Sequence, residues 1–323
     1  MTYDWTAYAE ADKDFISGFF QNSADLWKTK EGKQVGFPNF VNVYGIWYNV
    51  DLLKEAGLEA PKPGWTYEDL FQMAEKLADP AKEKYGLYGL QIDAFGVAQM
   101  AIGNGGEGFV DDFAYPTKVQ ADAEFTKAVE RIRGLIANKV IPSTTYETAN
   151  IQSQFTDGNV ALLAYGQWLI SDLINSDIKF EYGLAPNPVG ENGKQVSIFD
   201  PVGWCSPHNL EHPDEAWELM KFVCSDLYNT VLPVTPVAAC AYEPNAEAFF
   251  KTVTDAGHPE TADAIKTMMG ADVYVPVRFL QPWANDANKF WSPAYSAILD
   301  GEAEIDKLPE AIAELNDFIS GQN

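Results

Sequence analysis

Residues 36–70 constrain the fold more than any other part of the sequence. The run GFPNFVNVYGIWYNVDLL predicts a strand that closes at Pro38, then an extended segment rich in Val, Tyr, Ile and Trp, and then a short helix. The following GLEAPKPGWTYEDL contains a glycine stop, a proline-rich connector and the start of a second helix. This order predicts two lobes joined at residues 38–42, with a ligand held between them.

Length and charge exclude several classes of protein. A chain of 323 residues can bury a substantial core and predicts about two domains. It has 22 basic and 47 acidic residues, a net charge of −25, so its surface should repel nucleic acid and anionic membranes. No apolar run reaches the roughly 18 residues that span a bilayer. The N-terminal MTYDWTAYAEADKDF is acidic and aromatic, unlike a secretory signal.

Strand and helix patterns alternate along the chain, which predicts an α/β architecture. The expected strands are residues 33–37, 40–48, 85–92, 159–165, 180–184 and 196–199. The expected helices cover residues 12–20, 121–139 and 149–155, start near 67, 167 and 213, and dominate after 246. Thr66 and Asp69 fit a capping box for the helix near residue 67.

The motifs of common enzyme and cofactor sites are missing from the sequence. It contains no GxSxG, P-loop or GxGxxG motif, so no cofactor is expected. His208 and His212 are four apart but are bracketed by prolines, which favours a loop over a metal-binding helix face. The cysteines, Cys205, Cys224 and Cys240, are odd in number and are expected to pack as small hydrophobes.

Large aromatic residues recur beside Gly, Pro or polar residues, near the ends of expected strands. They are Tyr44, Phe95, Trp168, Trp204, Trp283 and Trp291. One such tryptophan most often belongs to a core, but several at turns suggest stacking platforms for a flat, partly apolar ligand. Sugar rings suit them because C–H faces meet aromatic rings while hydroxyls bond polar groups.

Five segments of the chain resemble the extracellular solute-binding proteins of ABC transporters, in the sugar-binding branch that includes maltose-binding protein. They are GKQVGFPNFVNVYGIWYNVDLLKEAGL, PGWTYEDLFQMAEKL, FTDGNVALLAYGQWLISDL, YGLAPNPVGENGKQVSIFDPVGWCSP with HPDEAWELMKFVCS, and FWSPAYSAILDGEAEIDKLPEAIAELN. The resemblance implies a two-lobe fold of sheets flanked by helices. It also implies a non-catalytic receptor that closes on a hinge around a carbohydrate and delivers it to the permease subunits of a transporter.

Carried over by position, the resemblance implies a set of ligand-binding residues. Trp168 would stack on the ligand, Trp291 would present a ring to it, and Asn42 would bond it at the crossover. Asp93 and Phe95 would lie in a loop after a strand, and core packing is expected for Tyr44 and Trp283. The complete set is Asn42, Asp93, Phe95, Trp168, Gly203, Trp204 and Trp291.

The N-terminal βαβ units of the family have no counterpart here. The resemblance therefore implies a truncated lobe 1, residues 1–38 and 205–256, and a nearly complete lobe 2, residues 39–204 and 257–323. The truncated lobe is expected to expose apolar surface and sheet edge, and so to associate with itself. The family is extracellular or periplasmic and often lipid-anchored, and a complete member is expected to be monomeric.

Three alternatives remain open. A glycoside hydrolase would use an acidic pair, for which Glu107, Asp111 and Asp112 are the candidates. A receptor for a cationic or peptide ligand would need carboxylates in its cleft, such as Asp93 and Asp111. The third alternative is a fragment without binding activity.

Overall fold

The computed structural model describes residues 2–146, 150–276, 281 and 283–321. The chain forms two compact units. Unit 1 comprises Met1–Val43, Gly166–Ser176 and Phe199–Asp263, and unit 2 comprises Tyr44–Tyr165, Asp177–Ile198 and Ala264–Asn323. Both units combine helices with strands, as the sequence predicts. The lobe boundaries expected from the family resemblance stay a prediction.

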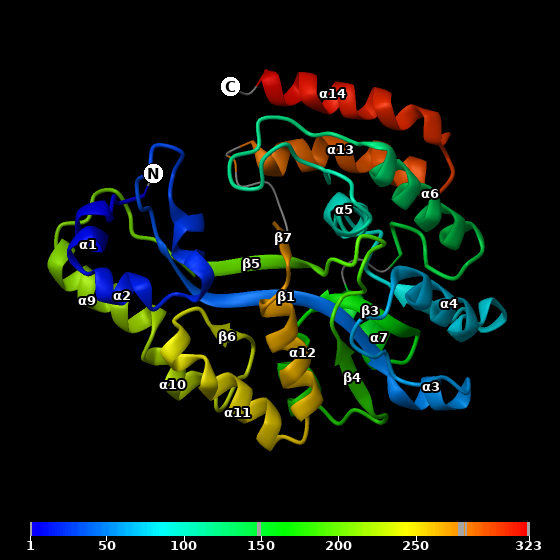
Figure 1. Ribbon diagram of the computed structural model, residues 1–323, viewed down its shortest axis with the longest axis horizontal. Coiled ribbons are helices and arrows are strands. Elements are labelled where there is room, and N and C mark those ends of the chain that lie inside the picture. Colours follow the sequence, from blue (N-terminus) through cyan, green and yellow to red (C-terminus); the bar gives the residue numbers. More distant parts are fainter. Residues whose placement is uncertain (1, 147–149, 277–280, 282, 322–323) are drawn as a thin grey trace. The chain divides into compact units, whose positions relative to one another are not determined.

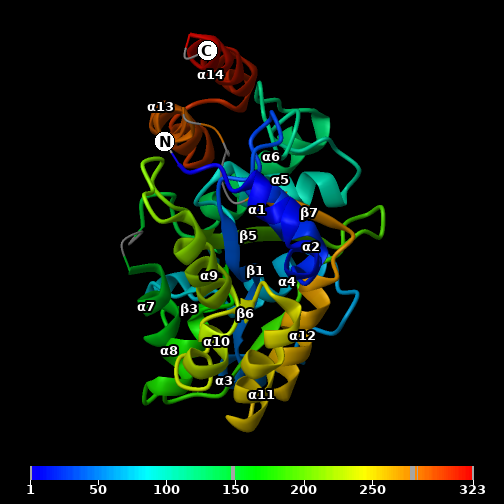
Figure 2. The same ribbon diagram turned by 90° about the vertical axis from the view of Figure 1, so that its left-hand side faces the viewer.

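Unit 1 packs short helices around one end of a long strand. Its elements are α1 (Thr6–Ala11), α2 (Lys13–Ser17), η1 (Phe20–Trp27), the first half of β1 (Phe37–Asn49), α8 (Leu169–Asn175), most of β5 (Val196–Trp204), α9 (Pro213–Cys224), α10 (Leu227–Val231), β6 (Ala239–Cys240), η4 (Glu243–Asn245), α11 (Glu247–Asp255) and the start of α12 (Pro259–Met269). Figure 2 shows β6 beside β1, where Phe40 pairs with Cys240.

Aromatic rings fill the core of unit 1. Trp217 of α9 lies at the centre, with ring centroids 5.6 Å from Trp5, 5.8 Å from Phe15 and 5.4 Å from Phe37. Pro213 at the first turn of α9 and two acidic residues after it fit the predicted helix start. The N-terminal segment is thereby fixed to a helix about two hundred residues away in the sequence.

Strand β1 is longer than the sequence suggested. A strand ending at Pro38 followed by a separate extended segment was expected, but one strand runs from Phe37 to Asn49. Its register against β5 shifts between Pro38 and Phe40, and this irregularity accommodates the proline within the strand. Residues up to Val43 belong to unit 1 and residues from Tyr44 to unit 2.

Unit 2 contains the longest helices of the described chain (Figure 1). Its elements are α3 (Val50–Glu55), α4 (Tyr67–Leu77), η2 (Pro80–Lys82), β2 (Tyr85–Tyr88), α5 (Ala94–Gly103), α6 (Ala123–Ala137), α7 (Ile151–Thr156), β3 (Val160–Gly166), β4 (Tyr182–Ala185), β7 (Val273–Pro276), α13 (Ala284–Leu299), η5 (Ile305–Lys307) and α14 (Leu308–Ser320). β2 pairs with β3 in parallel, and β4 pairs with the second half of β1 in antiparallel orientation.

Helix α5 of unit 2 was not predicted from the sequence, and neither was the short strand β7. A strand was expected over residues 85–92 and a loop after it, but β2 ends at Tyr88 and a helix follows from Ala94. All ten residues of α5 are buried, so its sequence has no polar face and no helical period to detect. By contrast, the predicted capping box of α4 is present, with Thr66 and Asp69 bonding reciprocally.

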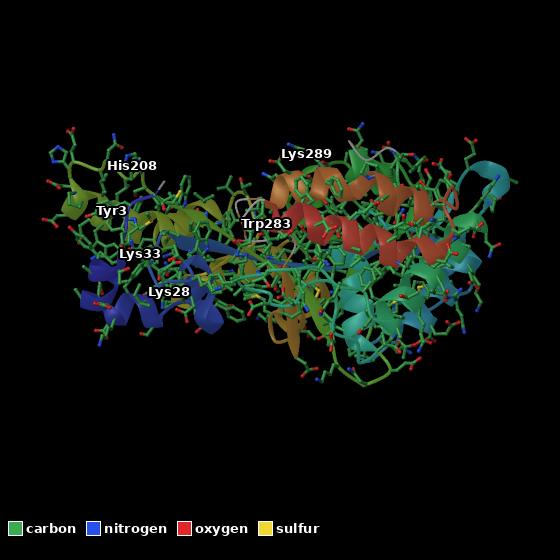
Figure 3. The ribbon with its side chains drawn as sticks, turned by 90° about the horizontal axis from the view of Figure 1, so that it is seen from above. Tyr3, Lys28, Lys33, His208, Trp283 and Lys289 are labelled. Carbon is green, nitrogen blue, oxygen red and sulfur yellow. The ribbon has the colours of Figure 1, made fainter. Side chains whose placement is uncertain are left out.

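The predictions for the cysteines are confirmed in part. Cys224 and Cys240 are buried as expected, but Cys205 is exposed, so its predicted packing as a small hydrophobe is wrong. His208 lies at the outer edge of unit 1 in Figure 3. Within the described residues, no group of His, Cys, Asp and Glu could hold a metal ion. None of the helices there is long and apolar enough to cross a bilayer.

Candidate functional site

Asn42, the crossover residue, lies in unit 1 opposite an acidic residue. Asn42 of β1 is directly opposite Asp200 of β5 in the antiparallel ladder. Directly opposed residues point to the same face, with Cβ atoms about 5 Å apart. Asn42 is buried and Asp200 is half-buried. An amide and a carboxylate therefore lie side by side, a combination that can bond the hydroxyls of a polar ligand.

The chain between β3 and α8 brings Trp168 to the same strand. The backbone N–H of Gln167 donates to Val43 O at 3.0 Å, and its Nε2 donates to Val41 O at 2.8 Å. Both bonds flank Asn42, so the next residue, Trp168, starts α8 beside this part of β1. A Cβ at Gly166 would lie 1.9 Å from the Trp168 ring, so only glycine fits there with this orientation of the indole. Trp168 is half-buried.

Gly203 and Trp204 form the end of β5 in unit 1, paired with Pro38 and Phe37 of β1. A Cβ at Gly203 would lie 2.1 Å from Phe37 O and 2.6 Å from the Trp27 ring. Packing alone therefore requires a glycine at this position, whether or not a ligand binds there. The side chain of Trp204 is 48% exposed. An indole exposed to this extent is available for stacking on a ligand.

Asp93 and Phe95 lie at the start of α5 in unit 2, not in the expected loop. Asp93 is the N-cap, and its Oδ1 accepts hydrogen bonds from Phe95 N at 2.9 Å and Gly96 N at 3.0 Å. Burial raises the pKa of the Asp93 carboxyl, although these two bonds oppose the rise. Tyr295 Oη donates to the backbone carbonyl of Asp93 at 3.2 Å, which joins α13 to this turn.

Phe95 and Trp291 both face the interior of unit 2. Phe95 is 6% exposed and Trp291 is 3% exposed. The ring of Phe109 lies between them, with centroids 5.9 Å from Phe95 and 5.3 Å from Trp291. Among the residues that the structure describes, the Trp291 indole N–H has no hydrogen-bond partner. Their contact with a ligand stays a prediction.

The seven predicted residues therefore gather in two groups, each within one unit. Unit 1 holds Asn42, Trp168, Gly203 and Trp204, and unit 2 holds Asp93, Phe95 and Trp291. Of the two aromatics for which core packing was expected, Trp283 is buried at the start of α13 (Figure 3) and Tyr44 is half-buried.

Sequence reasoning missed Asp200 and Gln167, which support Asn42 and Trp168. Asp200 stands in the segment FDPVGW, three residues before Gly203, and Gln167 directly precedes Trp168. The alternation of side chains along a strand could have placed Asp200 on the same face as Val202. Its pairing with Asn42 depends on the register of β1 against β5, which cannot be read from the sequence.

Two of the three acidic residues proposed for a hydrolase, Asp111 and Asp112, bind nearby backbone N–H groups in a turn. Asp111 Oδ1 accepts from the backbone N–H of Thr117 at 2.9 Å and of Lys118 at 3.0 Å. Asp112 Oδ1 accepts from Ala114 N and Tyr115 N, each at 2.8 Å. Both carboxylates hold the local backbone, so this segment needs no catalytic role to explain its acids.

Comparison with known families identifies the class. The model of the bacterial extracellular solute-binding protein family matches residues 1–232, so the chain belongs to that family. Proteins of this family bind solutes outside the cytoplasm, as its description states.

Individual relatives carry names that specify a sugar. The galactooligosaccharide-binding protein of Bacillus subtilis is 27% identical over 301 residues, covering 88% of this chain and 65% of that protein. The maltotriose-binding protein of Pyrococcus abyssi is 25% identical and covers 59% of this chain and 40% of that protein. The chain thus spans about two fifths to two thirds of the length of these relatives.

Solved structures share the fold. A substrate-binding protein of an ABC transporter from Listeria monocytogenes, in complex with cycloalternan, has a TM-score of 0.80 at 22% identity, covering 99% of this chain and 80% of that one. The cyclic α-maltosyl-1,6-maltose binding protein of Arthrobacter globiformis has a TM-score of 0.79 at 18% identity, covering 100% and 81%. These similarities confirm the two-lobe binding-protein fold that the sequence predicted, with part of each matched chain uncovered.

Proposed function

We propose that this chain is a non-catalytic receptor that binds a sugar or oligosaccharide and delivers it to the permease of an ABC transporter. The observation that carries the proposal is the family match together with relatives and structural neighbours whose names specify carbohydrates. The geometry of unit 1 supports it. An exposed Trp204 and a half-buried Trp168 accompany the polar pair of Asn42 and Asp200.

The free energy expected from stacking and hydrogen bonding at such a site is consistent with micromolar binding of a sugar. Covering about 100 Å² of apolar ring and sugar surface contributes roughly 2–3 kcal/mol. A micromolar complex needs about 8 kcal/mol net of association costs. Two stacked rings together with hydrogen bonds to Asn42 and Asp200 would account for this range.

The receptor is proposed to close on its ligand where the chain changes lobes, at residues 38–42 and 203–206. The lobes would be residues 1–38 with 205–256 and residues 39–204 with 257–323. We further propose that the protein works outside the cytoplasm as a lipid-anchored monomer when complete, without cofactor, catalysis or nucleic-acid partner.

Isothermal titration calorimetry with maltotriose and a galactooligosaccharide tests the proposal. Saturable binding of one of them is expected, and Trp204→Ala should weaken it at least about tenfold because one stacking surface is lost. Phe290→Ala is the matched control, since Phe290 of α13 is 45% exposed and lies outside the proposed site. Absence of binding to a panel of oligosaccharides by a folded protein would refute the receptor proposal for this chain.

A further inference from the structure

Trp204 is the exposed ring among the proposed sugar-binding residues, and its orientation depends on a neighbouring side chain. It is the last residue of β5, where its backbone pairs with Phe37 of β1. The backbone is therefore held, but the indole can still turn about its side-chain torsions. A ring that turns freely loses this freedom when a ligand stacks on it, and the loss weakens binding. A contact that fixes the indole before the ligand arrives therefore strengthens binding.

The hydroxyl of Tyr228 in α10 provides such a contact. It forms a hydrogen bond with the side chain of Trp204. An indole N–H can only donate, so Tyr228 Oη is the acceptor. The same oxygen accepts a hydrogen bond from Asn39 Nδ2 of β1. Trp204 is thus joined, through the hydroxyl of Tyr228, to the strand that pairs with β5.

Tyr228 is itself held firmly within unit 1. It is 4% exposed, and its ring centroid lies 4.5 Å from that of Phe40. Its backbone N–H donates to Ser225 O at 3.1 Å, and its carbonyl accepts from Leu232 N at 3.1 Å. The hydroxyl therefore has a fixed position, which is what a support for another side chain requires.

The need to satisfy a buried donor does not explain the contact with Trp204. The side chain is 48% exposed, so in another orientation its N–H would bond water at little cost. Asn39 is 5% exposed and has no such choice, so its amide N–H needs the oxygen of Tyr228. The hydroxyl of Tyr228 therefore satisfies one residue and orients the other.

We propose that Tyr228 is a positioning residue of the sugar-binding site, whose hydroxyl holds the indole of Trp204 in the orientation that stacks on a sugar ring. Tyr228 acts through Trp204 and not on the ligand directly. The proposal rests on the proposed receptor function. It adds a residue from α10, a helix that supplies none of the predicted ligand-binding residues.

Isothermal titration calorimetry tests the effect on affinity, with maltotriose or the galactooligosaccharide, whichever binds the wild type. Tyr228→Phe keeps the ring that packs on Phe40 and removes only the hydroxyl. It should weaken binding about fivefold, because the indole is no longer fixed before the sugar arrives. Tyr8→Phe is the matched control. It removes a tyrosine hydroxyl of unit 1 that donates to Asp214 instead, and it should bind like the wild type.

A double-mutant cycle shows whether the effect passes through Trp204. Trp204→Phe keeps an aromatic ring at this position and removes the N–H that bonds Tyr228. Tyr228→Phe should therefore weaken binding about fivefold in the wild type and leave it unchanged in the Trp204→Phe background. A purely structural role of Tyr228 would reduce the affinity by the same factor in both backgrounds.

NMR of the indole N–H groups in nitrogen-labelled protein provides a measurement without ligand. The resonance of Trp204 is the one that disappears in Trp204→Phe. Its proton should exchange with water about fivefold more slowly in the wild type than in Tyr228→Phe, because a hydrogen bond protects it. If Tyr228→Phe does not fold, exchange in the wild type that is slower than in free tryptophan still tests the contact.

Different outcomes overturn the receptor function and the positioning role. A folded wild-type protein that binds no oligosaccharide refutes both. Sugar binding that Tyr228→Phe leaves unchanged, or weakens equally in both backgrounds, refutes the positioning role alone. A Trp204 indole proton that exchanges as fast as that of free tryptophan refutes it as well. Circular dichroism of each variant verifies the fold.

Discussion

Unit 2 encloses its large apolar side chains, whereas unit 1 leaves several of them in solvent. Among the described residues, seven large hydrophobics are exposed, and only Phe290 belongs to unit 2. The other six are in unit 1, the shorter unit: Leu26, Val202, Trp204, Leu219, Phe222 and Val234. The expectation that residues 1–38 and 205–256 expose apolar surface agrees with four of these six.

Helix α9 shows what this difference means. It buries Trp217, Met220 and Cys224 on one face, yet its Leu219 is 59% exposed and its Phe222 is 48% exposed. Helix α6 of unit 2, by contrast, exposes no large apolar side chain on its outer side, where Lys127 and Glu130 lie. A helix with apolar residues on both faces marks a surface suited to contact with other protein. The stability of unit 2 should therefore depend on its interior, and the solution behaviour of unit 1 on its surface.

The largest expected difference concerns two tryptophans. Trp291→Ala removes a 3% exposed ring from the core of unit 2 and should lower the free energy of unfolding by about 3–5 kcal/mol. Trp204→Ala removes a 48% exposed ring from unit 1 and should cost less than about 1 kcal/mol. Urea unfolding of both variants measures the values, and equal losses would contradict the comparison.

Two glycines extend the test to backbone packing. Gly203→Ala should destabilise the protein by about 1–3 kcal/mol, because its Cβ would lie 2.1 Å from Phe37 O. Gly134→Ala in α6 is the matched change in unit 2, where no atom lies within 4 Å of the new Cβ. It should stabilise the protein by about 0.5–1 kcal/mol, since alanine favours the helix interior. Thermal unfolding should shift in opposite directions for the two variants.

Surface substitutions address the exposed residues directly. Leu219→Ser with Phe222→Ser should reduce self-association and binding of a hydrophobic dye, and change stability by only about 0.5 kcal/mol. Phe290→Ser in unit 2 should cost about 1 kcal/mol because its ring stacks on Phe318 at 4.9 Å. Analytical ultracentrifugation provides the measurement. A wild-type protein that stays monomeric at high concentration would contradict the role given to the surface of unit 1.

The smallest effect is a pH dependence in unit 2. The pKa of Asp93 is raised above 3.8, so the folded state holds this proton more tightly than the unfolded state. Its contribution to stability is therefore present below pH 3.8 and is lost as the pH rises through the folded pKa. Asp93→Asn keeps a side chain that can cap α5. Because asparagine does not ionise, the variant does not lose stability as the pH rises. Urea unfolding of both proteins should therefore show the stability of the variant rising relative to wild type as the pH increases from 3.8 through the folded pKa of Asp93. A difference in stability that does not change with pH would exclude this contribution of Asp93.

Local signals in the sequence predicted much of the secondary structure. The capping box at Thr66, the helix start at Pro213 and the amphipathic pattern of α6 are each present. Each depends on residues within a few positions of one another, so spacing alone reveals them. Helix α5 escaped prediction because a helix buried on all sides has no polar face.

The family resemblance predicted which residues are candidates for binding the ligand. It did not predict whether each of them is buried or exposed. The sequence treated Trp204 and Trp291 alike, as aromatics beside turns, yet one is half exposed and the other is enclosed by Phe109 and Tyr295. Asp200 was overlooked because its place opposite Asn42 follows from the register of two strands far apart in the chain.

By itself, the sequence determined where the helices with local start signals begin, that residues 40–48 are extended, and to which family the chain belongs. The tertiary structure decided which rings are buried and which strand residues face each other. Burial and pairing depend on neighbours contributed by distant segments. Those neighbours are fixed only when the free energy of packing has selected one arrangement of the whole chain.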